Sequence, residues 1–208
     1  MRGTLIIFVK APKAGRVKTR LGREIGIGRA AEIFRKLTAL TVAEAMSARR
    51  TGVEVVLAVD PPGEIRHWRR LWPGEFRRTP QSRGSLGDRL AAAIAEVERG
   101  PVVVIGADAP GFRARHVRAA FTALGAHDAV FGPATDGGFW LVGLARRRRA
   151  GPVFEGVRWS SKHALRDAQE SLPKSFRVAS LVWLGDIDEA GDLGAPILRS
   201  PARTLTAE

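Results

Sequence analysis

Residues 4–20 read TLIIFVKAPKAGRVKTR and join an apolar run to a cluster of positive charge. The run from Thr4 to Val9 is apolar and β-branched without alternation, which is typical of a strand covered on both faces. Covered strands of this kind belong to parallel sheets, whose neighbouring strands are joined by helical crossovers. The stretch therefore favours an α/β fold whose first strand ends directly in a basic loop.

The rest of the chain repeats this alternation. Further strands are expected at residues 53–59, 102–105, 129–131, 139–144 and 176–183, and helices at residues 30–50, 64–71, 86–97, 113–124 and 161–170. Such an order predicts a three-layer α/β/α sandwich with a mostly parallel, Rossmann-like sheet. Asp-Gly-Gly at residues 136–138 predicts one antiparallel excursion. Because no repeat or linker interrupts the order, residues 1–208 are expected to form a single domain.

The composition narrows the class of protein. With 208 residues, of which 45% are hydrophobic, the chain can bury a sizeable core. No apolar run approaches the length of a membrane span and no signal-peptide pattern opens the chain, so a soluble cytoplasmic protein is expected. The absence of cysteine excludes disulfides and thiolate metal sites. Four histidines without shared spacing indicate neither a zinc site nor a catalytic triad.

The net charge of +13 favours an anionic partner, although a solvated arginine-rich surface would also account for it. The run Arg146 to Arg149 precedes a turn signal and is expected in an exposed loop. A protein that binds nucleic acid remains a remote alternative. It would need aromatic side chains among the basic ones, and residues 9–21 contain none. Neither nucleic acid nor a membrane is therefore expected as a partner.

In an open α/β sheet, ligands bind beyond the carboxyl ends of the strands, and the basic loop lies at such an end. Its glycine allows a tight turn whose amides could cradle phosphate oxygens. The loop is neither a Walker A loop nor a dinucleotide fingerprint, and an exposed loop without a ligand is the alternative. The candidate phosphate-binding residues are Lys10, Lys13, Gly15, Arg16, Lys18 and Arg20.

Acidic residues follow two of the other expected strands. Asp108 lies in GADAP, directly after residues 102–105, where a carboxylate could share Mg²⁺ with substrate phosphates. A helix cap or an arginine partner would explain it equally well. Asp186, Asp188 and Asp192 follow the last strand, where one could act as a second metal ligand or cap a helix.

Two further segments could lie near the same edge. The Asp136 turn is at minimum a hairpin, but its glycine pair, Gly137 and Gly138, would also let a ligand approach the backbone closely. Trp159 precedes two serines that can cap a helix. It is either a hydrophobic staple or a platform for an acceptor molecule.

Five motifs occur in a fixed order: FVKAPKAGRVKTRL (residues 8–21), QSRGSLGDRL (81–90), IGADAPGF (105–112), GPATDGGFWLVGL (132–144) and VFEGVRWSS (153–161). Together they resemble a bacterial family, formerly a domain of unknown function, that is labelled as a glycosyltransferase linked to arsenosugar biosynthesis. That family is similar to nucleotide-diphospho-sugar transferases of the GT-A fold, and is akin to phospholactate guanylyltransferase and to molybdenum-cofactor nucleotidyltransferases. The resemblance extends over nearly the whole chain.

The resemblance implies that Asp108 holds a divalent metal and that the basic loop binds nucleotide phosphates. It also implies that Gln81, Gly87 and Asp88 lie near the nucleotide. The family pattern DIDTPEDL suggests Asp188 as the second metal ligand, although this chain reads DIDEAGDL, with Glu189 and Ala190 in place of Thr-Pro.

These observations predict a transferase that uses Mg²⁺ or Mn²⁺ and a nucleotide-diphosphate donor. The expected reaction is glycosyl transfer from a nucleotide sugar to a small acceptor, with Asp136 as the candidate catalytic residue and Gly137, Gly138 and Trp159 binding the acceptor. The alternative is a nucleotidyltransferase that joins a nucleoside triphosphate to a phosphorylated or carboxylated acceptor and releases pyrophosphate. Several cations after the first strand favour this alternative. A catalytically inactive relative is a further alternative, and the oligomeric state is not indicated by the sequence.

Overall fold

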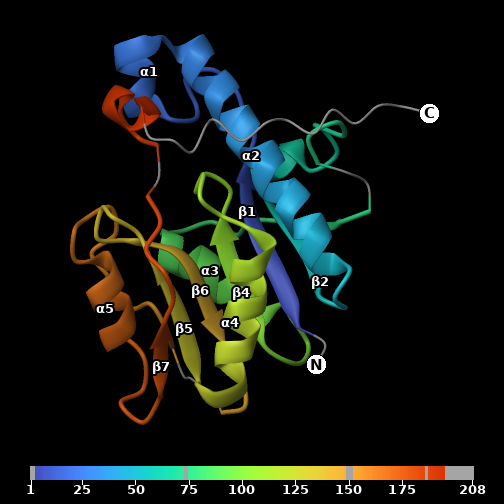
Figure 1. Ribbon diagram of the computed structural model, residues 1–208, viewed down its shortest axis with the longest axis vertical. Coiled ribbons are helices and arrows are strands. Elements are labelled where there is room, and N and C mark those ends of the chain that lie inside the picture. Colours follow the sequence, from blue (N-terminus) through green and yellow to red (C-terminus); the bar gives the residue numbers. More distant parts are fainter. Residues whose placement is uncertain (1–2, 73–74, 149–151, 186, 195–208) are drawn as a thin grey trace.

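The computed structural model describes residues 3–72, 75–148, 152–185 and 187–194 (Figure 1). Its strands are β1 (Thr4–Lys10), β2 (Glu54–Asp60), β3 (Arg77–Pro80), β4 (Val102–Gly106), β5 (Ala129–Pro133), β6 (Phe139–Leu144) and β7 (Val178–Ser180). They form one sheet in the order β3-β2-β1-β4-β6-β5-β7. β6 runs antiparallel to β4 and β5, while the other neighbouring strands are parallel. The expected α/β fold and its antiparallel excursion are confirmed.

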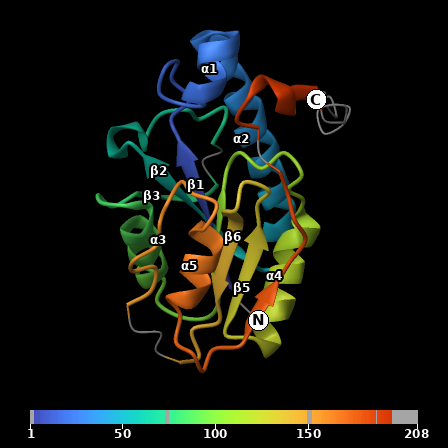
Figure 2. The ribbon, with the colours of Figure 1, turned by 90° about the vertical axis from the view of Figure 1, so that its left-hand side faces the viewer.

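Helices cover both faces of this sheet (Figure 2). They are α1 (Thr19–Ile25), α2 (Ile27–Arg49), α3 (Leu86–Ala95), α4 (Ala114–Ala126) and α5 (Ala164–Glu170), with short 3₁₀ turns η1 (Pro62–Glu64) and η2 (Ala190–Gly194). α2 and α4 pack on one face, and α3 and α5 on the other. Because successive strand side chains point to opposite faces, Ile7 joins the first core and Ile6 the second.

The sequence prediction differs from the structure at four places. The strand expected at residues 176–183 is limited to β7, and Leu181 to Trp183 follow it without strand structure. The helix expected at residues 64–71 is wrong, since only η1 forms there and Trp68 has a φ of 62°, a left-handed conformation that a continuous helix excludes. β3 was missed because its sequence, RRTP, carries no apolar alternation and lies at the sheet edge. α1 was missed as a separate helix, and Gly26, with a φ of 92°, divides it from α2.

The segment after β7 carries the chain across the carboxyl edge of the sheet. The amide of Leu181 donates to the carbonyl of Phe131 at 2.8 Å, and that of Leu184 to the carbonyl of Pro133 at 3.1 Å. η2 then lies beside α1 (Figure 1), where Ile187 is fully buried against Leu21. This course brings residue 188 to the loop that follows β1, while Asp186 lies outside the described residues. Among the described residues, no helix is both long and apolar enough to cross a membrane.

Candidate active site

The loop after β1 forms one wall of a cavity of about 440 Å³, here called the β1-loop cavity. The carboxyl ends of β1, β2 and β4 form its floor, as the fold predicts for a ligand site. Seven residues expected at the site line it: Lys10, Arg16, Lys18, Arg20, Gln81, Asp108 and Asp188. The topology thus brings together side chains that lie up to 178 positions apart, between Lys10 and Asp188, in one cavity.

Lys18 lies between the two carboxylates expected to bind a metal. Its ammonium Nζ is 2.9 Å from Oδ2 of Asp108 and 2.8 Å from Oδ1 of Asp188. The Lys18 side chain is only 4% exposed, whereas those of Asp108 and Asp188 are 39% and 40% exposed. Burial alone would lower the pKa of Lys18, but the charge of Asp108 and the hydrogen bond to Asp188 outweigh it and raise the pKa above its ordinary value. Lys18 is therefore a cation at neutral pH.

The backbone of Lys18 adopts an unfavourable, left-handed conformation. Lys18 precedes the first turn of α1 with φ 44° and ψ 51°, a left-handed conformation that costs a non-glycine residue about 1–3 kcal/mol. Buried neighbours on either side hold this conformation, since Val17 packs against Phe34 and Leu21 is fully buried. The ion pairs to Asp108 and Asp188 help to offset the strain.

The two carboxylates fit the requirements of a Mg²⁺ or Mn²⁺ ion. They already hold one cation between them, and each is open to solvent, so water and phosphate oxygens could complete the oxygen ligands that Mg²⁺ prefers. Gly106 leaves room for Asp108, because a Cβ at residue 106 would lie 3.1 Å from its Oδ1. The described part of the chain holds no group of three or more His, Asp or Glu side chains able to hold a metal by themselves. Water and substrate oxygens could supply further ligands beside these two carboxylates.

Asp192 does not line the β1-loop cavity, but it holds the backbone of Asp188 in place. Its Oδ2 accepts hydrogen bonds from the amides of Asp188 and Glu189, both at 2.9 Å. Asp192 thus caps the turn that carries Asp188 and Glu189. Replacement of the family's Thr-Pro by Glu189 and Ala190 leaves Asp188 directed at Lys18.

Two of the expected phosphate-binding residues lie outside the cavity wall. Lys13 donates to Oε1 of Glu64 at 2.5 Å, and Trp68 donates its indole N–H to the other oxygen of that carboxylate at 2.9 Å. These bonds tether the basic loop to the segment after β2. Gly15 has a φ of 73° and no heavy atom within 4 Å of the position of a Cβ, so it serves the turn itself.

Gln81 lies in the wall, where its buried side chain ties together the ends of two strands. Its amide Nε2 donates to the carbonyls of Val9 at 3.3 Å and Ala58 at 2.9 Å. Its Oε1 accepts from Nη1 of Arg89 at 3.0 Å. Because these bonds occupy the amide, Gln81 shapes the cavity and orients Arg89.

Arg89 is a residue of the site that the sequence analysis missed. It lines the β1-loop cavity, and its Nε has no hydrogen-bond partner among the described residues. The signal that could have found it is its place in the motif QSRGSLGDRL, one position after Asp88. Because a helix turns about 100° per residue, Arg89 points in a different direction from Asp88.

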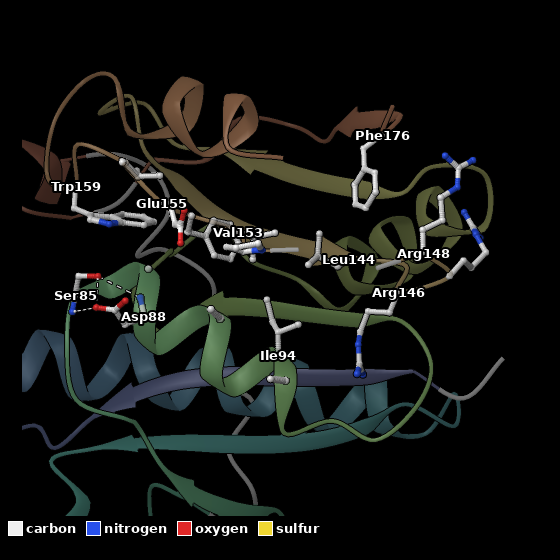
Figure 3. A pocket seen from close by; sticks show the side chains of 18 residues that line it. Ser85, Asp88, Ile94, Leu144, Arg146, Arg148, Val153, Glu155, Trp159 and Phe176 are labelled. Atoms are coloured by element: carbon white, nitrogen blue, oxygen red, sulfur yellow. Dashed lines mark hydrogen bonds between the residues drawn. The ribbon is translucent and has the colours of Figure 1, made fainter. Parts of the chain in front are cut away.

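Gly87 and Asp88, expected near the nucleotide, instead line a different and larger cavity of about 890 Å³ (Figure 3). There Asp88 caps α3: its Oδ2 accepts from the amide and hydroxyl of Ser85, both at 2.8 Å, and these bonds lower the pKa of Asp88. A Cβ at Gly87 would lie 3.0 Å from the carbonyl oxygen of Phe154. Both residues thus have structural roles, which helix capping and close packing explain without a nucleotide.

A third cavity, of about 380 Å³, lies beside the turn between β5 and β6 and is here called the hairpin cavity. Its wall includes Asp136, Gly138 and Trp159, which were expected at the acceptor site, together with Ser160 and Ser161. Gly106 and Asp108 line both the hairpin cavity and the β1-loop cavity. The two cavities therefore meet at Asp108.

Asp136 lies exposed at the tip of the β5–β6 turn. Its Oδ1 accepts from the amide of Gly138 at 2.8 Å, which orients the carboxylate. Gly137 has a φ of 87°, and a Cβ there would lie 2.5 Å from the backbone of Lys162. Gly137 does not line the hairpin cavity, so its role is to let the turn pack against the segment before α5.

Trp159 forms an aromatic wall of the hairpin cavity. The centroid of its ring lies 6.0 Å from that of Phe139 and 6.4 Å from that of Phe154, and both pairs are arranged edge to face. Arg158, the residue before Trp159, is held by Asp167. Its amide and guanidinium donate three hydrogen bonds to the Asp167 carboxylate, at 2.7–3.1 Å. These hydrogen bonds hold the pKa of Asp167 well below its usual range.

Comparison with known proteins places the chain in a family. Residues 41–161 match the model of a family described as "Uncharacterized protein conserved in bacteria" (DUF2064). The chain belongs to this family. The matched DUF2064 region contains Asp108 and Asp136, while the basic loop and Asp188 lie outside it. A search of curated proteins finds no match.

Solved structures share the fold over most of the chain. A candidate nucleotide-diphospho-sugar transferase from Desulfovibrio desulfuricans G20 is 24% identical, with a TM-score of 0.77 over 95% of this chain and 90% of that one. The 4-diphosphocytidyl-2C-methyl-D-erythritol synthase of Anaerococcus prevotii is 10% identical, with a TM-score of 0.56 over 92% and 94%. A mannosyltransferase of Pyrobaculum calidifontis, solved with GDP-mannose and Mn²⁺, is 15% identical, with a TM-score of 0.53 over 88% of this chain and 56% of its own. At these identities the likeness establishes the nucleotide-diphospho-sugar transferase fold.

Proposed function

We propose that the protein is a metal-dependent transferase that takes a sugar from a nucleotide-diphosphate donor and passes it to a small acceptor. The observation that carries this proposal is the position of Asp108 in the walls of both the β1-loop cavity and the hairpin cavity. A group transfer needs donor and acceptor on either side of one reacting centre. The mannosyltransferase of the same fold, which binds GDP-mannose and Mn²⁺, supports the donor class.

The residues of the β1-loop cavity would hold the donor. Arg16, Arg20 and Arg89 would bind its phosphates, and the guanidinium fork suits phosphate oxygens. Asp108 and Asp188 would hold a Mg²⁺ or Mn²⁺ ion, which supplies electrostatic stabilisation of the leaving diphosphate when bound.

The hairpin cavity would hold the acceptor. Its aromatic wall, Trp159 and Phe139, suits the face of a sugar or another small apolar ring. Asp136 would accept the proton of the acceptor hydroxyl, since its carboxylate is exposed and oriented by Gly138. The finer assignment to arsenosugar biosynthesis rests on the resemblance of the five motifs alone.

Nucleotidyl transfer is the second candidate, and the number of cations around the β1-loop cavity favours it. Lys10, Arg16, Arg20 and Arg89 line one small space, which suits a triphosphate that releases pyrophosphate. The 4-diphosphocytidyl-2C-methyl-D-erythritol synthase of the same fold and the resemblance to phospholactate guanylyltransferase support this candidate.

Thermal unfolding against a panel of nucleotide sugars and nucleoside triphosphates, with Mg²⁺, Mn²⁺ or EDTA, distinguishes the two candidates. A ligand at 100 times its Kd should add about 2.7 kcal/mol to the free energy of unfolding. Stabilisation by a nucleotide sugar that EDTA abolishes supports glycosyl transfer. Stabilisation by a triphosphate alone supports nucleotidyl transfer, and no stabilisation by any nucleotide contradicts both.

A further inference from the structure

Lys18 is the feature of the cavity that phosphate binding does not explain. A lysine meant only for phosphates would extend toward solvent, and Arg16 of the loop and Arg20 in the first turn of α1 are both exposed. The Lys18 side chain is instead 4% exposed and lies within 2.9 Å of both carboxylates that would hold the metal. Of the basic loop, it alone contacts Asp108 and Asp188 among the described ion pairs.

The charges at this position oppose a free divalent ion. Asp108 and Asp188 together carry two negative charges, and Lys18 neutralises one of them. A divalent ion would use these same carboxylate oxygens as ligands. It would then lie within a few ångströms of the Lys18 ammonium, and two cations this close repel strongly where the effective dielectric is low.

A diphosphate would change this balance. Its oxygens offer Lys18 new anionic partners beside the loop, where Arg16 and Arg20 already face the cavity. Once the ammonium turns toward the phosphates, both carboxylates are free of their internal cation.

We infer that Lys18 competes with the divalent metal for Asp108 and Asp188, so that the free protein binds the metal weakly and gains it together with the diphosphate of its substrate. This inference rests on the proposed function and adds to it an order of binding. Linkage requires that metal and nucleotide strengthen each other's binding by the same factor. The arrangement would keep the free protein from retaining a metal without its substrate.

Binding of Mn²⁺ to the full-length protein without nucleotide, followed by the electron paramagnetic resonance signal of free Mn²⁺, tests the inference. Lys18→Met removes the competing ammonium and should tighten Mn²⁺ binding on the order of tenfold or more. Arg23→Met makes the same change in net charge in the last turn of α1, at an exposed residue that no described ion pair joins to either carboxylate. It should leave the Mn²⁺ Kd within about twofold of wild type, as expected for a screened surface charge. Adding Asp108→Asn to Lys18→Met should remove the gain.

Thermal unfolding shows whether the Lys18→Met variant is folded. Lys18→Met leaves the two carboxylates without their cation, so its melting temperature should fall below wild type in EDTA and recover more than wild type when Mn²⁺ is added. If Lys18→Met does not fold, Lys18→Gln keeps a polar head and serves in its place. A variant that binds Mn²⁺ no better than Arg23→Met overturns the inference.

The outcomes also separate this inference from the proposed function. If a nucleotide stabilises the protein with metal but Lys18→Met leaves the Mn²⁺ Kd unchanged, the transferase proposal stands and the competition fails. If Lys18→Met tightens Mn²⁺ binding but no nucleotide stabilises either protein, the competition stands and the transferase proposal fails.

Discussion

The two cavities that meet at Asp108 are built in opposite ways. In the β1-loop cavity most charges already have partners: Lys18 holds Asp108 and Asp188, and Arg89 donates to Gln81. The walls of the hairpin cavity include aromatic rings and serines. Asp136 is in none of the ion pairs found among the described residues. A dense, prearranged set of charges suits a phosphate ligand, whereas rings and hydroxyls suit an uncharged one. The difference supports our proposal that the β1-loop cavity takes the donor.

Of the substitutions that test these separate roles of the two cavities, Asp108→Asn is expected to have the largest effect on donor binding. Loss of a metal ligand should weaken metal-dependent nucleotide binding at least about 100-fold. A stabilisation of about 2.7 kcal/mol at 100 times the wild-type Kd should then fall to about 0.4 kcal/mol. Thermal unfolding with the donor and Mn²⁺ measures it.

Asp136→Asn is the matched control from the hairpin cavity. It should leave the donor's thermal stabilisation unchanged but lower turnover by about 10²–10⁴, the range for loss of a general base. If Asp136→Asn abolished donor binding as Asp108→Asn does, the assignment of separate roles to the two cavities would be wrong.

The glycines of the two loops should differ in their tolerance of a side chain. Gly137→Ala places a Cβ 2.5 Å from the backbone of Lys162 at a φ of 87°, and should lower the free energy of unfolding by about 3 kcal/mol. Gly15→Ala has a similar φ but open space around it, so about 1 kcal/mol is expected. Urea denaturation compares the two, and equal losses would show that Lys162 moves away.

The ion pair of Arg158 with Asp167 predicts a pH dependence for the segment that carries Trp159. Since folding lowers the pKa of Asp167, its contribution to stability is complete above the ordinary value of 3.8 and is lost as the pH falls toward the folded value. Asp167→Asn should therefore melt below wild type at pH 7, and the gap should narrow below about pH 4. A gap that stayed constant down to pH 3 would contradict this assignment.

Lys13→Gln should have the smallest effect. It removes the bond to Glu64, but the Lys13 side chain is 52% exposed, and exposed ion pairs contribute about 0–1 kcal/mol. A melting temperature within a few degrees of wild type is expected, with donor affinity little changed, because Lys13 lies outside the cavity wall. A large loss of donor affinity would show that Lys13 leaves Glu64 for the phosphates.

Sequence patterns predicted the strands of the sheet because Thr4–Val9 and its counterparts are apolar and β-branched, and burial on both faces requires this. The rule that ligands bind beyond strand ends placed Lys18, Asp108 and Asp136 at one edge. Patterns could not show that Lys13 pairs with Glu64 or that Asp88 caps α3, because such choices depend on distances between segments. β3 was missed for the related reason that an edge strand need not be apolar.

Asp188 reaches the site on the segment that follows β7, the strand at one edge of the sheet. Backbone bonds at Leu181 and Leu184 hold it to β5 and the residues just beyond it, and Ile187 anchors it on α1. A segment held this way can detach at a lower free energy than the whole domain needs to unfold. Under the proposed function, a local folding equilibrium would then set the fraction of molecules able to bind metal. On warming, the amides of residues 181–190 should exchange with deuterium, and the site should lose its second carboxylate, before the central sheet melts.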